Sequence, residues 1–293
     1  MTARQLFGVG VGPGDPELIT VKAVRVLAEA GLVLVPVMAG ASPAEPGRAE
    51  ATVRAHIDGA AIRRVPFALS DRGGVTPGRR AAWDGAAREV AAAFSTGTLT
   101  VAFATIGDPN IYSTFSYLAQ AVRELVPGVI VQTVPGITAM QDLAARSGTV
   151  LTEGNESLAL LPLASHGEVG ADAGGKPAGS LAIGGSGVSP GQRIVPPGQP
   201  TRLAVLRDAL SRHDTVVAYK LGMKAGGPAD GVTALLDSLD HAGRLGDAVY
   251  GARLGLPGED IRMARELHAA EDLPYLSTLI APGRRASIGS KLR

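Results

Sequence analysis

The strongest constraint on the fold is a regular alternation of short apolar runs with amphipathic helical patterns. Four runs in the first half are brief, rich in branched residues and bounded by Gly or Pro, as buried strands are: Leu6 to Gly12, Leu32 to Met38, Leu99 to Ala104 and Val129 to Val134. Helical patterns separate them. Strands that alternate with helices predict an α/β fold with a largely parallel sheet covered on both faces.

The segment between the first two runs predicts a helix with recognisable ends. Asp15 is a suitable N-cap, Pro16 suits the first helical position, and Gly31 can terminate the helix. The apolar residues of one face follow helical spacing: Ile19, Ala23, Val26, Leu27 and Ala30. We therefore expect this face to pack on the sheet.

A second series of strands and helices begins near residue 155. Its expected elements are Ser157 to Leu163, Leu203 to Ser211, Thr215 to Leu221, Val232 to Leu239, Ala248 to Leu254 and Tyr275 to Ala281. The chain thus divides into two α/β domains, 1–152 and 153–293, and we expect a ligand cleft between them. Residues 165–200 are dense in Gly, Pro and Ser without sustained periodicity, which predicts a mobile insertion, either a lid or a disordered loop.

Charge and composition exclude several function classes. With 28 Lys and Arg against 27 Asp and Glu, the net charge of +1 gives no long-range field for nucleic acid or anionic membranes. The absence of cysteine excludes disulfides, thiolate metal sites and cysteine nucleophiles. The histidines lack metal-ligand spacing, so we expect no protein metal site. Neither a signal peptide nor a long apolar span is evident, which predicts a cytoplasmic protein.

The glycine-rich stretch GVGVGPGDP follows the first predicted strand. Its glycines repeat every second residue from Gly8 to Gly14, whereas the dinucleotide-binding fingerprint needs a glycine three positions after the second one. The second strand also ends without the acidic residue that holds a ribose. Both observations disfavour a nicotinamide oxidoreductase. A titration that showed binding of a reduced nicotinamide would favour that class again. A loop that lets a ligand approach the backbone remains, as does a purely structural turn.

A second loop, IGDPNIYSTF, follows the strand at residues 99–104. Gly107, Asp108 and Pro109 are compatible with a strand-to-helix turn, and the hydroxyl side chains of Tyr112, Ser113 and Thr114 follow before the next helix. The residues alone leave a structural turn and a ligand-binding loop both open.

Three stretches together resemble one family. VGPGDPELITVKAVRVLAEA, IGDPNIYSTFSYL and VPGITAMQDLAARSG are similar, in this order, to motifs of the tetrapyrrole (corrin/porphyrin) methyltransferases, which act on S-adenosylmethionine. The hydroxyl-rich second stretch most resembles the branch that methylates C20 of precorrin-2, or of its cobalt form, in vitamin B12 synthesis. The resemblance also implies a homodimer. Another tetrapyrrole methylase and a non-catalytic cofactor-binding protein remain alternatives.

The resemblance implies a set of binding residues. Those expected at S-adenosylmethionine are Pro13, Ile106, Gly107, Asp108, Ile111, Thr138, Ala139, Tyr219 and Lys220, with the Asp108 carboxylate facing polar groups of the cofactor. Those expected at the tetrapyrrole are Asp15, Tyr112, Ser113 and Thr114. The substrate bears many carboxylates, so we expect cations there too, and the arginine-rich stretch offers Arg63, Arg64 and Arg72, with an ordinary solvated surface as the alternative.

The implied reaction places few demands on the protein. An electron-rich meso carbon attacks the methyl group of a sulfonium, so no protein nucleophile is required. Holding two reactants in line supplies much of the rate. No residue of the sequence identifies itself as a catalytic base.

Overall fold

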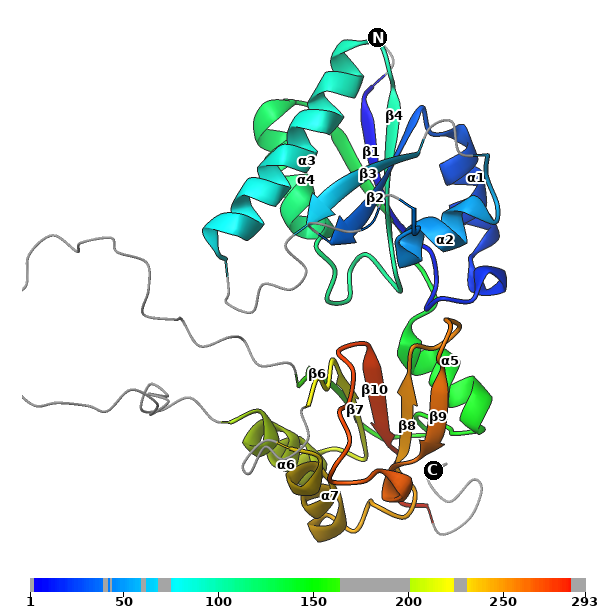
Figure 1. The fold of residues 1–293 in the computed structure, drawn as a ribbon, viewed down its shortest axis with the longest axis vertical. Helices are drawn as coiled ribbons and strands as arrows, with labels where there is room; N and C mark the ends of the chain where they lie inside the picture. Colours follow the sequence, from blue (N-terminus) through cyan, green and yellow to red (C-terminus); the bar gives the residue numbers. More distant parts are fainter. Residues whose placement is uncertain are drawn as a thin grey trace, which may run out of the picture.

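The computed structural model describes residues 3–38, 42, 44–58, 62–67, 75–163, 201–223 and 231–285. These residues form two five-stranded sheets, each with helices packed on it (Figure 1). The predicted insertion at residues 165–200 and the candidate Arg72 lie outside the described residues.

The first sheet is entirely parallel, as the sequence predicts. Its strands are β1 (Gln5–Gly10), β2 (Leu32–Met38), β3 (Ile62–Phe67), β4 (Thr100–Thr105) and β5 (Ile130–Val134), in the order β3-β2-β4-β1-β5. Only β3 was not expected. It is an edge strand that carries two consecutive arginines, and a partly solvated edge needs no apolar run.

Helices cover both faces of this sheet. On one face lie α1 (Val21–Glu29) and α2 (Arg48–Arg54), which pack on buried strand residues such as Val9, Val33 and Ala104. On the other face lie α3 (Pro77–Ser95) and α4 (Phe115–Leu125), whose Trp83 and Leu118 belong to a cluster around Phe103. The two faces therefore have separate apolar cores.

The helix expected from Asp15 to Gly31 is divided in two. Asp15 does cap a turn that begins at Pro16, but this turn is a short 3-10 helix, η1 (Pro16–Leu18). The chain is extended at Ile19 and Thr20, and the Thr20 hydroxyl accepts from the Ala23 nitrogen to start α1. The first backbone N–H groups of a helix have no carbonyl acceptor within the helix, and a Thr side chain can accept from one of them. Thr20 can therefore start a new helix here, in competition with continuation of the preceding turn.

The second sheet is mixed, in contrast to the parallel sheet of the first half. Its strands are β6 (Leu158–Pro162), β7 (Thr215–Tyr219), β8 (Val249–Ala252), β9 (Asp260–Met263) and β10 (Ser277–Ala281), in the order β6-β7-β10-β8-β9. Only β6 and β7 pair in parallel. The last strand, β10, runs antiparallel to both neighbours, and β8 and β9 form an antiparallel pair. A short connection between β8 and β9 permits only this direction.

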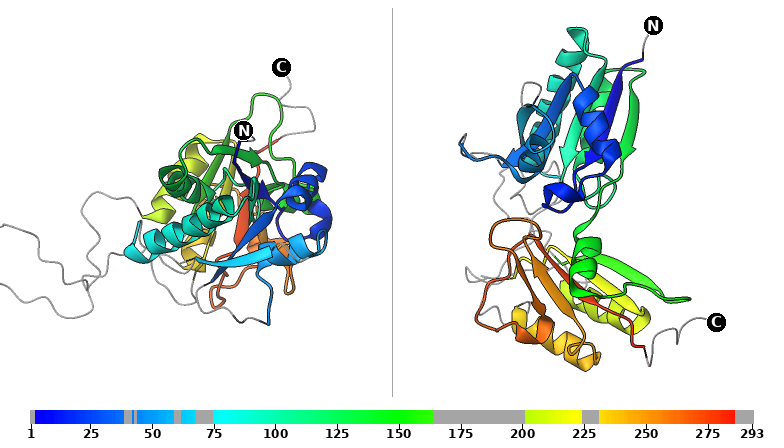
Figure 2. Two further views of the ribbon diagram at one scale, coloured as in Figure 1. Left: turned by 90° about the horizontal axis from the view of Figure 1, so that it is seen from above. Right: turned by 90° about the vertical axis from the view of Figure 1, so that its right-hand side faces the viewer.

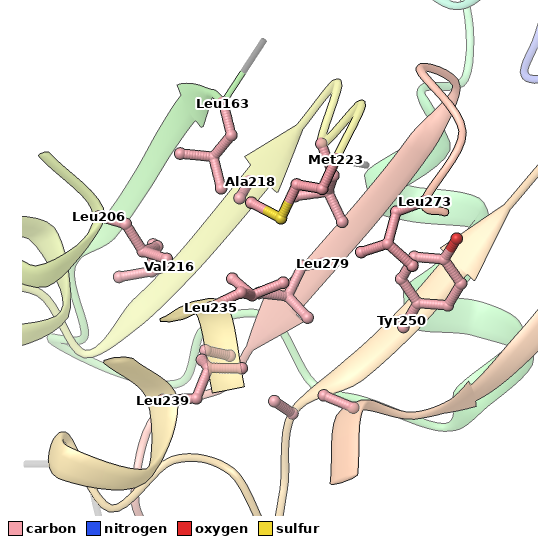
Figure 3. Close-up of a cluster of buried hydrophobic side chains, with 14 of the residues drawn as sticks. Leu163, Leu206, Val216, Ala218, Met223, Leu235, Leu239, Tyr250, Leu273 and Leu279 are labelled. Atoms are coloured by element: carbon pink, nitrogen blue, oxygen red, sulfur yellow. The ribbon is translucent and has the colours of Figure 1, made fainter. Parts of the chain in front are cut away.

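Helices α6 (Arg202–Arg212) and α7 (Val232–His241) cover one face of the second sheet. Figure 3 shows Leu206, Leu235 and Leu239 from these helices pointing at Val216 and Leu279 of the strands. The short 3-10 helix η3 (Ala264–Glu266) completes this core.

The opposite face of the second sheet is covered by α5 (Ala139–Ser147), whose Leu143 packs with Val217 and Ile280. In Figure 2 the two halves lie one above the other, with α5 beside the second sheet. By packing, the chain therefore passes to the second half between β5 and α5, ahead of the boundary that we placed after residue 152. Among the described helices, none is long and apolar enough to cross a membrane.

Candidate functional site

The order of the first sheet indicates where a ligand binds. Strands β1 and β4 are neighbours, but the chain leaves β1 for α1 on one face and leaves β4 for α4 on the other. In open α/β sheets, ligands bind beyond the carboxyl ends of two adjacent strands whose connections diverge in this way. The loops after β1 and β4 are the two glycine-containing loops that the sequence marks.

Glycines bring the backbones of three segments into direct contact at this point. The Gly107 nitrogen donates to the Gly12 carbonyl oxygen at 2.7 Å. A Cβ atom added to Gly136 would lie 2.1 Å from the Gly107 oxygen, and one added to Gly10 would lie 2.5 Å from the same oxygen. A side chain at Gly10 or Gly136 would therefore separate the segments. In contrast, a Cβ at Gly107 would meet nothing within 4 Å, so its α-carbon faces open space.

Asp108 connects two of these loops. One carboxylate oxygen accepts from the Asn110 nitrogen at 2.8 Å, and the other accepts from the Gly136 nitrogen at 3.0 Å. The residue is buried. Its carboxylate is thus bonded to backbone groups of its own and a neighbouring loop, and contact with a cofactor stays a prediction.

The loop before α5 leads to the second half. Thr138 begins a capping box, in which the Gln141 side chain accepts from the Thr138 nitrogen at 2.9 Å, and Ala139 is the first residue of the helix. The Met140 nitrogen donates to the Tyr219 hydroxyl at 2.9 Å. Burial raises the pKa of this hydroxyl. Tyr219, at the end of β7, therefore supplies an acceptor for a backbone group in the first turn of α5.

The end of the second loop reaches the second half through Tyr112. Its hydroxyl donates to the Leu160 oxygen at 3.2 Å, and its ring packs edge-on against Tyr219. The Lys220 ammonium lies 5.5 Å from the ring centroids of Tyr112 and of Tyr275. Tyr112 and Lys220 both have a positive φ, of 50° and 58°. Residues other than glycine rarely adopt this backbone conformation, and such strained residues cluster at functional sites. Sequence analysis expects Tyr275 only as the start of a strand, and nothing in the sequence pattern indicates its contact with Lys220.

Other residues expected at the site serve the local structure. Ser113 accepts from the Phe115 nitrogen at 3.2 Å and starts α4, where the N-cap Thr114 makes no side-chain cap bond. Ile106 packs with the α1 face of the first half, whereas Ile111 packs with the α5 cluster of the second.

The loop after β1 packs against the second half. Pro13 is buried there. A Cβ on Gly14 would lie 2.3 Å from the Leu254 oxygen, and one on Gly255 would lie 2.1 Å from the Asp15 nitrogen. Loops of both halves therefore surround Pro13 and Asp15.

The arginines expected at the substrate are occupied elsewhere. Arg63 pairs with Glu89 of α3, and the Arg64 Nε lies 2.7 Å from an oxygen of Glu50 in α2. Burial alone would raise the pKa of Glu50, but hydrogen bonds from Arg64, Arg54 and the Gly47 nitrogen lower it. Both arginines lie on the edge strand β3 and are not brought together with the glycine loops. No group of acidic residues and histidines in the described ranges could hold a metal ion.

The sequence matches the family model of the Tetrapyrrole (Corrin/Porphyrin) Methylases over residues 5–267. The chain belongs to this family. A relative from Sinorhizobium sp, named Precorrin-2 C(20)-methyltransferase, is 32% identical over 95% of this chain and 95% of its own. A relative from Methanocaldococcus jannaschii, named Probable cobalt-precorrin-2 C(20)-methyltransferase, is 34% identical over 54% of this chain.

The present chain spans 64% of the length of the Methanocaldococcus protein and 47% of the length of a Mycobacterium tuberculosis relative named Cobalamin biosynthesis protein CobIJ. Among solved structures, the methyltransferase CobJ has the same fold: the TM-score is 0.57 at 18% identity, and the match covers 97% of this chain and 98% of that one. The expected fold, two α/β halves of the tetrapyrrole methylase type, is confirmed.

Proposed function

We propose that this protein is an S-adenosylmethionine-dependent methyltransferase that methylates C20 of precorrin-2 in cobalamin biosynthesis. Membership of the methylase family and the Sinorhizobium relative, aligned over nearly both full lengths, support the reaction. The observation that carries it is the meeting of the loops after β1 and β4, with the loop after β8 in the second half packed directly against the loop after β1. The cobalt-containing substrate is the second candidate, because the Methanocaldococcus relative carries that name.

The residues at this site suit a nucleoside-bearing cofactor. Gly107 has open space beside its α-carbon, and the loops present backbone groups there, so a ligand can approach the main chain closely. S-adenosylmethionine held by these loops would supply an activated methyl group for carbon 20, with S-adenosylhomocysteine as the leaving group and loss of one proton from the methylated product. We assign the cofactor to the loops at Pro13, Gly107 and Thr138, with Tyr219 and Lys220 closing the site from the second half.

In this proposal the protein acts by positioning. Asp108 fixes the Gly107 loop against Gly136, and Tyr219 fixes the start of α5. Such held geometry replaces a bimolecular encounter between the two reactants. We further propose that the protein acts in the cytoplasm as a homodimer, without nucleic acid or membrane partners.

A methyl-transfer assay tests the proposal. The protein is incubated with isotopically labelled S-adenosylmethionine and either precorrin-2 or cobalt-precorrin-2, and the product is examined by mass spectrometry and NMR. Gain of one labelled methyl group at C20 supports the function, and the faster substrate identifies the natural form. Binding of S-adenosylmethionine without transfer to either substrate would favour a non-catalytic protein or another methylase. Binding of a reduced nicotinamide alone would favour an oxidoreductase.

A further inference from the structure

Two arginines of like charge approach each other from the two halves of the molecule. Arg48 is the first residue of α2, and Arg253 directly follows β8. Partial burial lowers the pKa of Arg48, and the nearby charge of Arg253 lowers it further. Within the part of the chain that the structure describes, neither guanidinium pairs with a carboxylate. Two unpaired cations that lie close together repel each other unless an anion joins them.

The contacts around these residues place them beside the glycine-rich loop. On one side, the Thr52 hydroxyl of α2 lies 3.5 Å from the Gly14 oxygen. On the other, Gly14 packs directly on the Leu254 oxygen, next to Arg253. In Figure 1 the turn between β8 and β9 points toward the half that carries α2. The two arginines thus flank residues 12–15, at the carboxyl end of β1.

The backbone at Arg253 is held in an uncommon conformation. Its φ is 51°, in the left-handed region that favours glycine. Its nitrogen donates to the Leu276 oxygen at 3.0 Å, and its oxygen accepts from the Leu256 nitrogen at 2.9 Å. A long charged side chain at a strained position is consistent with a functional requirement for the direction in which it points.

We propose that Arg48 and Arg253 together bind a carboxylate arm of the tetrapyrrole substrate. This inference rests on the proposed function, since a polycarboxylate substrate must find cations near the reacting methyl group. A guanidinium donates parallel hydrogen bonds to a carboxylate, and the two oxygens of one carboxylate have enough acceptor sites to bridge two guanidinium groups and reduce their repulsion. Arg63 and Arg64 are less suited, because each is already paired with a glutamate.

The test separates anion binding from catalysis. Uroporphyrin III, a stable tetrapyrrole with eight carboxylates, is titrated into the protein and followed by its fluorescence, and a cationic porphyrin of similar size serves as the control ligand. The variants are Arg48→Ala, Arg253→Ala and the double variant. Arg25→Ala is the matched control, because Arg25 is an exposed arginine of α1. Titration with S-adenosylmethionine and a thermal melt accompany each variant.

We expect each single variant to bind uroporphyrin III about tenfold more weakly and the double variant about a hundredfold more weakly, because each substitution removes charge-assisted hydrogen bonds to the ligand. Arg25→Ala should bind as the wild type does, and affinity for S-adenosylmethionine should stay within about twofold. The melting temperature of the single variants should hold or rise, because a repulsion is removed. A purely structural role would lower it instead.

The outcomes for the two proposals are distinguishable. Wild-type affinity in all three arginine variants, or no uroporphyrin III binding by the wild-type protein, overturns the assignment of the two arginines, whether or not methyl transfer occurs. If binding depends on the arginines but the wild-type protein methylates neither precorrin, the anion site stands and the proposed function fails.

Discussion

The Asp108 carboxylate accepts a hydrogen bond from the Gly136 nitrogen at 3.0 Å, and so joins the loop after β4 to the loop that precedes α5. Its other oxygen accepts from the Asn110 nitrogen in its own loop. Helix α5, which follows this loop, packs on the second sheet, where the Tyr219 hydroxyl accepts from the Met140 nitrogen. Asp108 is therefore at the start of a chain of contacts that fixes one half against the other at the candidate site.

Asp108→Ala should lower both stability and cofactor affinity. The substitution leaves two backbone N–H groups in a buried region without their charged acceptor, which costs about 1.5–3 kcal/mol in the free energy of unfolding. Because the loops at Gly107 and Gly136 lose their connection, we expect about ten- to hundredfold weaker binding of S-adenosylmethionine. Chemical denaturation and isothermal titration measure the two effects. Unchanged affinity in a folded variant would move the cofactor assignment to the Pro13 loop.

Gly136→Ala should be strongly destabilising although it adds only one methyl group. The new Cβ would lie 2.1 Å from the Gly107 oxygen and 2.8 Å from backbone atoms of Gly10, so no flexible side chain can move aside. Overpacking of this kind costs about 1–3 kcal/mol, and more where backbone must shift. The matched control is Gly85→Ala in α3, where the nearest atom would be 3.9 Å away. That change should stabilise the protein by up to about 1 kcal/mol.

A melting temperature for Gly136→Ala equal to that of the wild type would contradict the close packing of the three segments. Loss of S-adenosylmethionine binding with retained folding would still agree with it, because the loops could separate without global unfolding.

Much of the fold follows from local patterns, and the exceptions have physical causes. The apolar run Leu32 to Met38 coincides with β2, since a strand buried on both faces must be apolar throughout. Strand β3 escaped prediction because Arg63 and Arg64 interrupt its apolar pattern, and only their glutamate partners on α3 and α2 explain their presence in a strand. The direction of β10 depends on pairing with β7 and β8, which no local signal encodes.

The candidate site was likewise predicted only in part from the sequence. The glycine motifs and the resemblance to the family indicated the loops, and the structure places Gly12 and Gly107 in contact. The charge pattern does not show that Arg63 and Arg64 are each paired with a glutamate, because a cluster in the sequence carries no information on which cations are already neutralised. Arg48 and Arg253 are far apart in the chain and lie in no cluster, so only the packing of α2 and the β8–β9 turn around residues 12–15 reveals them.

Arg64→Ala should reduce the stability of the protein without weakening the binding of the substrate. Its guanidinium neutralises Glu50, whose side chain is fully buried, and Arg54 remains as the second partner. Loss of one charged hydrogen bond predicts a decrease of about 1.5–3 kcal/mol in the free energy of unfolding. Arg63→Ala, whose ion pair is exposed, should change it by less than about 1 kcal/mol. A large rise in KM for precorrin-2 with unchanged stability would instead support Arg64 as a substrate residue.

The pair formed by Glu156 and Arg285 should make stability depend on acidic pH. Glu156 precedes β6 and Arg285 follows β10, so the pair connects the segment before β6 to the end of the described chain. The Glu156 side chain is shielded from solvent, and the Arg285 Nε donates to it at 2.9 Å. These hydrogen bonds hold the pKa of the Glu156 carboxyl below its usual range.

Because the folded-state pKa lies below that of the unfolded chain, about 4.3 for an unperturbed glutamate, the unfolded chain takes up its proton first as the pH falls. The contribution of Glu156 is therefore complete above that value and is lost as the pH falls through the folded-state pKa. Glu156→Gln should melt below the wild type at pH 7, and the difference should shrink toward pH 3. Glu89→Gln, in an exposed pair, should show a small difference at every pH. Parallel melting curves for Glu156→Gln and the wild type across this range would show that the ion pair does not stabilise the fold.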